Sequence, residues 1–94
     1  MVYIQKAVIE GIYDVVYPER STGTHRWGRE VWLNDIKIGS RGQMFFVEDG
    51  VLKRTRLSTI SNIIEQNGIL EIYTQTSLYR LRLLFDLASY TLIN

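Results

Sequence analysis

The sequence predicts an all-β fold, either a small meander barrel or a two-layer β-sandwich of about eight short strands. Val, Ile, Thr, Tyr, Phe and Trp supply 36 of the 94 residues, whereas alanine, the strongest helix former, occurs only twice. Residues that accept a positive φ or start turns separate short apolar segments at close intervals. The length suits one domain, residues 1–94, without an internal repeat or a linker.

The expected strands follow from the apolar segments and the turns between them. Residues 2–17 are apolar at nearly every position and predict a long bent strand with a bulge or bend at Gly11. Asn34-Asp35 predicts a tight hairpin that joins residues 30–33 to residues 36–38. Later turns are expected at Glu48-Asp49-Gly50, as a three-residue loop with Gly50 left-handed, at Asn67-Gly68 and at Gln75-Thr76.

Side-chain alternation assigns faces to the last clear hairpin. Leu70, Ile72 and Thr74 share one face of their strand, as Tyr79, Leu81 and Leu83 do on the partner, so one side of this hairpin is expected to be buried. Residues 85–94 form either a final strand or a short helix. An apolar end in so small a barrel also predicts a homo-oligomer, with residues 84–93 as the candidate contact.

Composition excludes several classes of protein. Without cysteine there is no disulfide, no thiol chemistry and no thiolate metal site. No apolar run reaches the length of a membrane helix, and the N-terminus lacks the pattern of a secretion signal, so we expect a cytoplasmic protein without a membrane partner.

The net charge is only +1, but residues 20–56 hold eight of the eleven basic residues. The middle of the chain is therefore the basic part.

The long connection at residues 18–30 contains the strongest candidate site. It combines arginines, the single histidine, hydroxyl groups, a tryptophan and two glycines. Guanidinium groups and backbone amides suit a phosphate, and an indole ring stacks on a flat ring. The composition predicts a site for a small anionic ligand that carries phosphate, such as a nucleotide, and the alternative is a surface loop held by packing of Trp27. The ligand-binding candidates are Arg20, Thr24, His25, Arg26, Trp27 and Arg29, together with Arg41.

Arg41 enters this set from a second turn. Gly39 and Gly42 flank it, which favours either an anion-binding nest of backbone amides or a simple bend between strands. In a simple meander, the hairpin through Asn34-Asp35 returns the chain toward residue 29. We therefore expect Arg26, Arg29 and Arg41 to converge.

Enzyme activity is not predicted. One histidine, no cysteine and no Ser-His-acid order leave little for nucleophilic catalysis, although the imidazole of His25 belongs to a side-chain type that can act as a general base. The carboxylates lack the spacing of a glycosidase pair or a metal cage. We expect a binding protein with no catalytic residues, no metal and no cofactor.

Two other binding functions remain open. A single-stranded nucleic acid would use aromatic rings with nearby arginines, but the near-neutral charge disfavours it; the candidates are Trp27, Trp32, Phe45, Tyr73, Tyr79, Arg54, Arg56, Arg80 and Arg82. A protein-interaction or inhibitor module would act through an oligomeric β-surface.

In its general character, a very small cysteine-free all-β chain with one loop rich in Arg, Trp and Gly, the sequence resembles the accessory proteins of phages and other mobile elements. Some of these proteins sequester a host nucleotide signal in a pocket between subunits, and others block a host protein by contact. The resemblance implies a viral or mobile-element protein that sequesters its ligand, and it assigns no individual residue.

Overall fold

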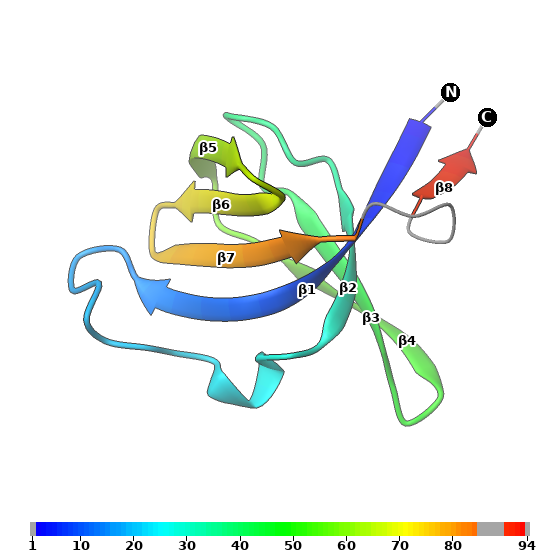
Figure 1. The fold of residues 1–94 in the computed structure, drawn as a ribbon, viewed down its shortest axis with the longest axis horizontal. Coiled ribbons are helices and arrows are strands. Elements are labelled where there is room, and N and C mark those ends of the chain that lie inside the picture. The colour runs from blue at the N-terminus through cyan, green and yellow to red at the C-terminus, as the bar shows by residue number, and fades with distance from the viewer. Residues whose placement is uncertain (1, 85–89, 94) are drawn as a thin grey trace.

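The computed structural model describes residues 2–84 and 90–93, and the predicted all-β class is confirmed. A single turn of 3₁₀ helix, η1 (Thr24–Arg26), interrupts the strands in this part of the chain (Figure 1). The strands are β1 (Val2–Asp14), β2 (Glu30–Asn34), β3 (Gln43–Glu48), β4 (Val51–Arg56), β5 (Ile60–Gln66), β6 (Ile69–Thr74), β7 (Ser77–Leu83) and β8 (Tyr90–Ile93).

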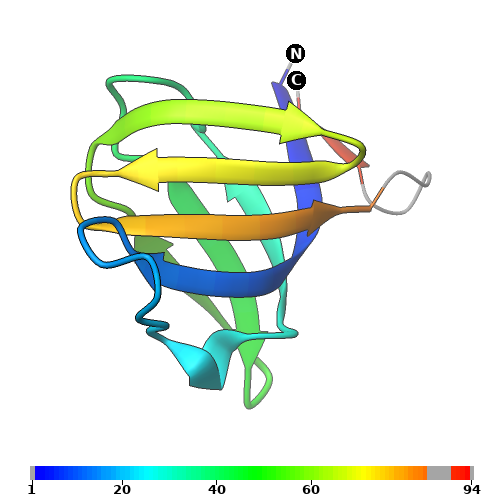
Figure 2. The same ribbon diagram turned by 60° about the vertical axis from the view of Figure 1, so that its left-hand side comes forward.

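All the strand pairs are antiparallel, and their order is β4-β3-β2-β1-β7-β6-β5, with β8 paired to the first residues of β1. The sheet folds on itself into two layers that cross at a large angle (Figures 1 and 2). β1 belongs to both layers, since residues 5–8 pair with β2 and residues 7–14 pair with β7. This arrangement agrees with the predicted small barrel or sandwich.

Gly11 provides the bend in β1, as the sequence predicted. The register with β7 shifts between Ile9 and Gly11, which is the signature of a bulge. The ring of Tyr13 lies over Gly11, so that a Cβ built there would be 2.5 Å from the Tyr13 hydroxyl. A side chain at this bulge would therefore force the Tyr13 ring to move.

The core forms from the inward faces of the strands, and the predicted alternation in β6 and β7 is confirmed. Leu70, Ile72 and Thr74 are buried, and so are the three predicted partners on β7. The buried apolar residues are Ala7, Ile9, Ile12, Val31, Leu33, Met44, Leu57, Ile60, Leu70, Ile72, Tyr79, Leu81 and Leu83.

The turns at residues 48–50, 67–68 and 75–76 are found where they were expected. Asn67 and Gly68 both have positive φ, 54° and 79°, as a two-residue hairpin turn requires. Asp49 and Gly50 have φ of 53° and 75°, and Glu48 still belongs to β3. The loop after β3 therefore has two residues instead of the predicted three.

The predicted hairpin through Asn34-Asp35 is wrong. β2 ends at Asn34 and pairs with β3, and residues 36–38 form no strand. The Ser40 hydroxyl donates to Oδ2 of Asp35 at 2.6 Å, which closes residues 35–40 into a compact turn. Ile36 packs on the core, whereas Ile38 is 64% exposed. Leu57 and Ile60 donate backbone hydrogen bonds to this turn region, which joins it to the start of β5.

The end of the chain was predicted to be a strand or a helix. Residues 90–93 form strand β8, which pairs with β1 at residues 2–5. Residues 85–89 of the predicted contact segment 84–93 lie outside the described residues, as does residue 94.

Candidate functional site

The long connection between β1 and β2 lies along the free edge of β1. The Thr22 amide donates to the Ile12 carbonyl at 2.8 Å, and the Gly28 amide donates to the Ile9 carbonyl at 2.7 Å. In return, Ile9 donates to the Arg29 carbonyl at 3.0 Å. These bonds supply partners to strand groups that would otherwise be open to water, and they hold the loop in one shape.

Asp14 starts this connection. Its carboxylate accepts hydrogen bonds from the amides of Val16 and Tyr17, at 2.8 and 2.9 Å. These two bonds stabilise the ionised form and lower the pKa of Asp14. Arg20 follows at the far end of the turn, where its guanidinium lies 4.4 Å from the centre of the Tyr17 ring.

Trp27 is held to the strand below it but keeps an accessible surface. Its ring centre lies 5.9 Å from that of Tyr13, and its indole N–H donates to the Thr22 carbonyl at 3.2 Å. The side chain is nevertheless 37% exposed. Trp27 therefore packs on Tyr13, as the alternative role considered for it requires, while part of the residue stays exposed.

Arg26 is the unusual residue of the loop. Its guanidinium lies close to Gly23, whose φ of 56° is in the left-handed region. The Nε atom is buried, and no described residue accepts a hydrogen bond from it. A buried donor without an acceptor is costly, so the loop holds the Arg26 guanidinium at an energetic cost.

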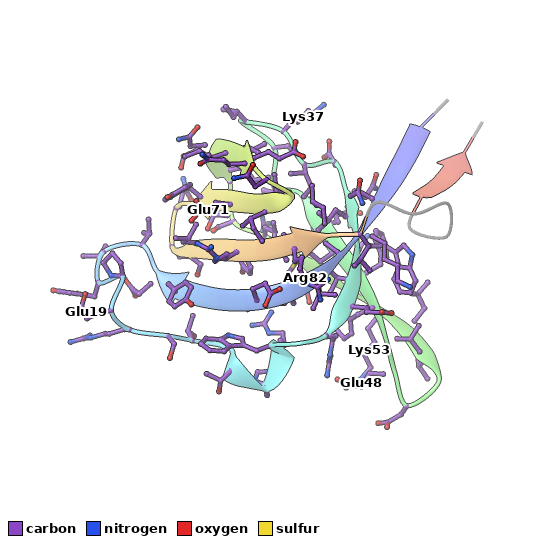
Figure 3. The ribbon with its side chains drawn as sticks, viewed as in Figure 1. Glu19, Lys37, Glu48, Lys53, Glu71 and Arg82 are labelled. Atoms are coloured by element: carbon purple, nitrogen blue, oxygen red, sulfur yellow. The ribbon has the colours of Figure 1, made fainter. Side chains whose placement is uncertain are left out.

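Arg29 connects the loop to the hairpin formed by β3 and β4. Its Nη1 lies 2.9 Å from Oε2 of Glu48, and its guanidinium lies 4.8 Å from the centre of the Phe46 ring. Nζ of Lys53 approaches the other carboxylate oxygen of Glu48 at 2.7 Å. Hydrogen bonds from Lys53 and from Arg29 lower the pKa of Glu48. Glu48 and Lys53 lie together between η1 and the hairpin (Figure 3).

The predicted convergence with Arg41 is not found, because it depended on the hairpin that does not form. Arg29 precedes β2 and Arg41 lies in the loop that follows it, so the length of β2, about 16 Å, separates their positions. Lys37, in the same loop as Arg41, lies at the end of the molecule opposite Glu48 (Figure 3). The Nε of Arg41 donates to the Leu57 carbonyl at 2.9 Å, which is a structural contact.

The structure therefore keeps only part of the predicted set together. The Arg29 amide donates to the Arg26 carbonyl at 3.2 Å, so Arg26, Trp27 and Arg29 share one turn of chain. Thr24 and His25 are exposed beside them in η1. Arg20 lies near the start of the loop, and Arg41 lies at the other end of β2.

Sequence reasoning missed Glu48 and Lys53. The sequence pattern puts Glu48 in a hairpin loop, and nothing local to Glu48 or Lys53 points to Arg29. The proximity of Glu48 and Arg29 follows from the pairing of β2 with β3, because this pairing brings the end of β3 beside the start of β2.

Two surface hollows lie elsewhere, and neither is lined by a residue of the predicted ligand-binding set. One, of about 340 Å³, is lined by Gln66, Asn67, Ile69, Glu71 and Arg80. The other, of about 260 Å³, has an apolar floor and is lined by Gln5, Leu33, Asp35, Ile36, Ile63, Glu65, Leu70 and Leu83.

Among the described residues there is no group of three or more His, Asp or Glu side chains placed to hold a metal ion. In the same part of the chain, no helix has the length and hydropathy to cross a membrane.

Comparison with known proteins finds no matching family model, no matching curated protein and no matching solved structure. The fold and the loop define a small all-β protein with a basic connection packed against a projecting hairpin.

Proposed function

We propose that this chain is a non-enzymatic binding protein that sequesters a phosphate-bearing small molecule, such as a nucleotide, between the loop at residues 20–29 and the β3–β4 hairpin. The observation that carries the proposal is the position of the Glu48 carboxylate. Arg29 and Lys53 hold it from two different elements, at 2.9 and 2.7 Å. Two cations are thus already arranged around one anionic group.

A phosphate suits the same pair of cations. It carries more charge than a carboxylate and offers three acceptor oxygens, so it competes for charge-assisted hydrogen bonds. Arg26, one turn of chain away, adds a guanidinium with a buried N–H that no described residue accepts. Trp27 provides a partly exposed ring for stacking on a base. The ligand would be held by these four side chains without a proton-transfer step.

Fluorescence of Trp27 tests this function. The chain has two tryptophans, so in a Trp32→Phe variant Trp27 is the single indole. We expect mono-, di- or cyclic nucleotides to change its emission, and Arg29→Ala or Lys53→Ala to weaken binding about tenfold or more, because each removes a charge-assisted bond. Arg82→Ala is the matched control, since Arg82 also forms a surface salt bridge, at 2.8 Å with Glu10, but in another part of the sheet.

Two results would contradict the proposal. One is equal nucleotide affinity in Arg29→Ala, Lys53→Ala and the control. The other is the absence of binding across the whole nucleotide panel, by fluorescence and by native mass spectrometry. Circular dichroism of each variant separates loss of binding from loss of fold.

A further inference from the structure

The outer face of the β1–β4 layer carries a row of four side chains on four neighbouring strands. Lys6 pairs with Trp32, Trp32 with Phe45, and Phe45 with Arg54. Directly opposed residues in a sheet share a face. The intervening residues Val31, Leu33 and Met44 are buried on the inner face, so this row points outward. We call this row, with Val47, Leu52 and Arg56 beside it, the outer platform.

Aromatic and apolar groups form the middle of the outer platform. Trp32 and Phe45 are both partly exposed, and Nζ of Lys6 lies 5.5 Å from the centre of the Trp32 ring. The next cross-strand pair, Val47 and Leu52, is 53% and 64% exposed. The β3–β4 hairpin that carries this pair projects from the body of the molecule (Figure 1). The platform is therefore an accessible surface with two flat rings.

Two of the three cations of the outer platform lack internal partners. Arg54 and Arg56 are exposed and form neither a salt bridge nor a side-chain hydrogen bond with any described residue. Glu30, the acid that shares this face, is paired with Lys6 at 3.1 Å.

The outer face of the other layer differs. There, Arg80 and Arg82 approach Glu71 and Glu10, at 3.8 and 2.8 Å. The excess positive charge of the sheet surface is therefore concentrated beside the two rings of the outer platform.

We propose that the outer platform binds single-stranded nucleic acid. Bases stack on Trp32 and Phe45, whose strands lie about 4.8 Å apart, while Arg54, Arg56 and Lys6 contact phosphates. A flat aromatic pair with cations at its border is the arrangement that stacks bases without reading their sequence. The near-neutral net charge of the chain disfavours long-range attraction to nucleic acid, but the phosphate contacts themselves depend on the cations of the outer platform. The platform shares no residue with the nucleotide site proposed above.

The test uses a Trp27→Phe variant, in which Trp32 is the single tryptophan. It is titrated with oligothymidylate and oligouridylate of about 12 nucleotides, enough to cover one small β-domain. We expect quenching of Trp32, and three phosphate contacts predict that affinity falls about 20-fold between about 50 and about 200 mM salt. The DNA and RNA arms show whether the 2′-hydroxyl matters.

Variants of the outer platform test which of its side chains contact the oligonucleotide. Arg54→Ala with Arg56→Ala is expected to weaken binding at least about tenfold at low salt and to flatten the salt dependence, because two of three phosphate contacts are lost. Phe45→Leu retains an apolar side chain and is expected to weaken binding by removing a stacking ring. Arg80→Ala with Arg82→Ala is the matched control and should leave the affinity within about twofold.

Three outcomes would overturn the proposal. One is the absence of quenching and of salt-dependent binding at about 50 mM salt. A second is unchanged affinity in the Arg54 and Arg56 double variant. The third is self-association that Leu52→Lys abolishes, seen by sedimentation, because the platform would then be covered by a second copy of the chain. None of these results bears on nucleotide binding reported by Trp27.

Discussion

Arg29 and Glu48 join two elements that are distant in the sequence, since Nη1 of Arg29 lies 2.9 Å from Oε2 of Glu48. Arg29 ends the long connection after β1, and Glu48 ends β3. Lys53 completes the group at 2.7 Å from the same carboxylate. Glu48 therefore neutralises the cations that the proposed ligand needs, and it must be displaced when a phosphate binds.

Glu48→Gln is expected to raise nucleotide affinity. The amide keeps the shape of the side chain but removes the negative charge, so Arg29 and Lys53 attract a phosphate without a competing anion. The expected gain is about three- to tenfold, the size of a modest charge effect at a partly exposed site. Nucleotide titration monitored by Trp27 in the Trp32→Phe background measures it. Unchanged or weaker binding would show that Glu48 does not occupy the place of the ligand.

Acid is expected to destabilise the fold through Asp35 and Glu48. A hydrogen bond from Ser40 lowers the pKa of Asp35, and bonds from Lys53 and Arg29 lower the pKa of Glu48. A carboxyl whose pKa is lower in the folded state stabilises the fold above its unfolded pKa. That contribution is lost as the pH falls below about 4 and through the lower folded value.

Urea unfolding at about pH 7, 4 and 3 measures this loss. The double variant Asp35→Asn, Glu48→Gln should lose less stability between the upper and lower pH than the unmodified chain. Glu19→Gln is the control, because Glu19 forms no salt bridge with any described residue. An equal loss in the double variant and the unmodified chain would contradict the assignment.

The parts of the fold that depend on local chemistry could be predicted from the sequence. Asn67-Gly68 adopts positive φ cheaply, and Gly11 permits a bulge, so both positions were found. Asn34-Asp35 offers similar local chemistry without a glycine, and there the Ser40 hydroxyl bound to Asp35 determines a different turn. A hydrogen bond within such a turn is not visible in strand periodicity.

The candidate site was harder to predict because it depends on which strands are neighbours. Alternation gives the face of a side chain but not the strand beside it, so the loop at Arg26, Trp27 and Arg29 was identified without Glu48 or Lys53. The same limit explains Arg41, whose expected place depended on a pairing of residues 30–33 with residues 36–38. The observed pairing of β2 with β3 sends Arg41 and Arg29 to opposite ends of β2.

Arg41→Ala is expected to affect stability and to leave nucleotide binding unchanged. Arg41 donates to the Leu57 carbonyl at 2.9 Å, so its removal should cost about 1 kcal/mol in the free energy of unfolding. Urea unfolding measures that cost, and nucleotide affinity should remain within about twofold. Arg29→Ala, expected to weaken binding, is the comparison. A tenfold loss of affinity in Arg41→Ala would return Arg41 to the binding site.

Gly11→Ala is expected to destabilise the protein and to disturb Trp27. An added Cβ would lie 2.5 Å from the Tyr13 hydroxyl and 2.7 Å from its ring, so the ring must move. Overpacking of this kind costs about 1–3 kcal/mol. Because Trp27 packs on Tyr13 at 5.9 Å, its fluorescence in the Trp32→Phe background should change as well.

A double-mutant cycle identifies the clash with Tyr13 as the cause. In a Tyr13→Ala background the space above Gly11 is open, so the same Gly11→Ala substitution should cost less than about 0.5 kcal/mol. Urea unfolding of the four proteins gives the coupling between the two residues. Coupling near zero would mean that the bulge itself rejects alanine, and the requirement for glycine would then lie in the backbone of β1. Strong coupling would show that Gly11 is required because the Tyr13 ring covers it. The bend of β1 would then be linked to Trp27, because Trp27 packs on that same ring.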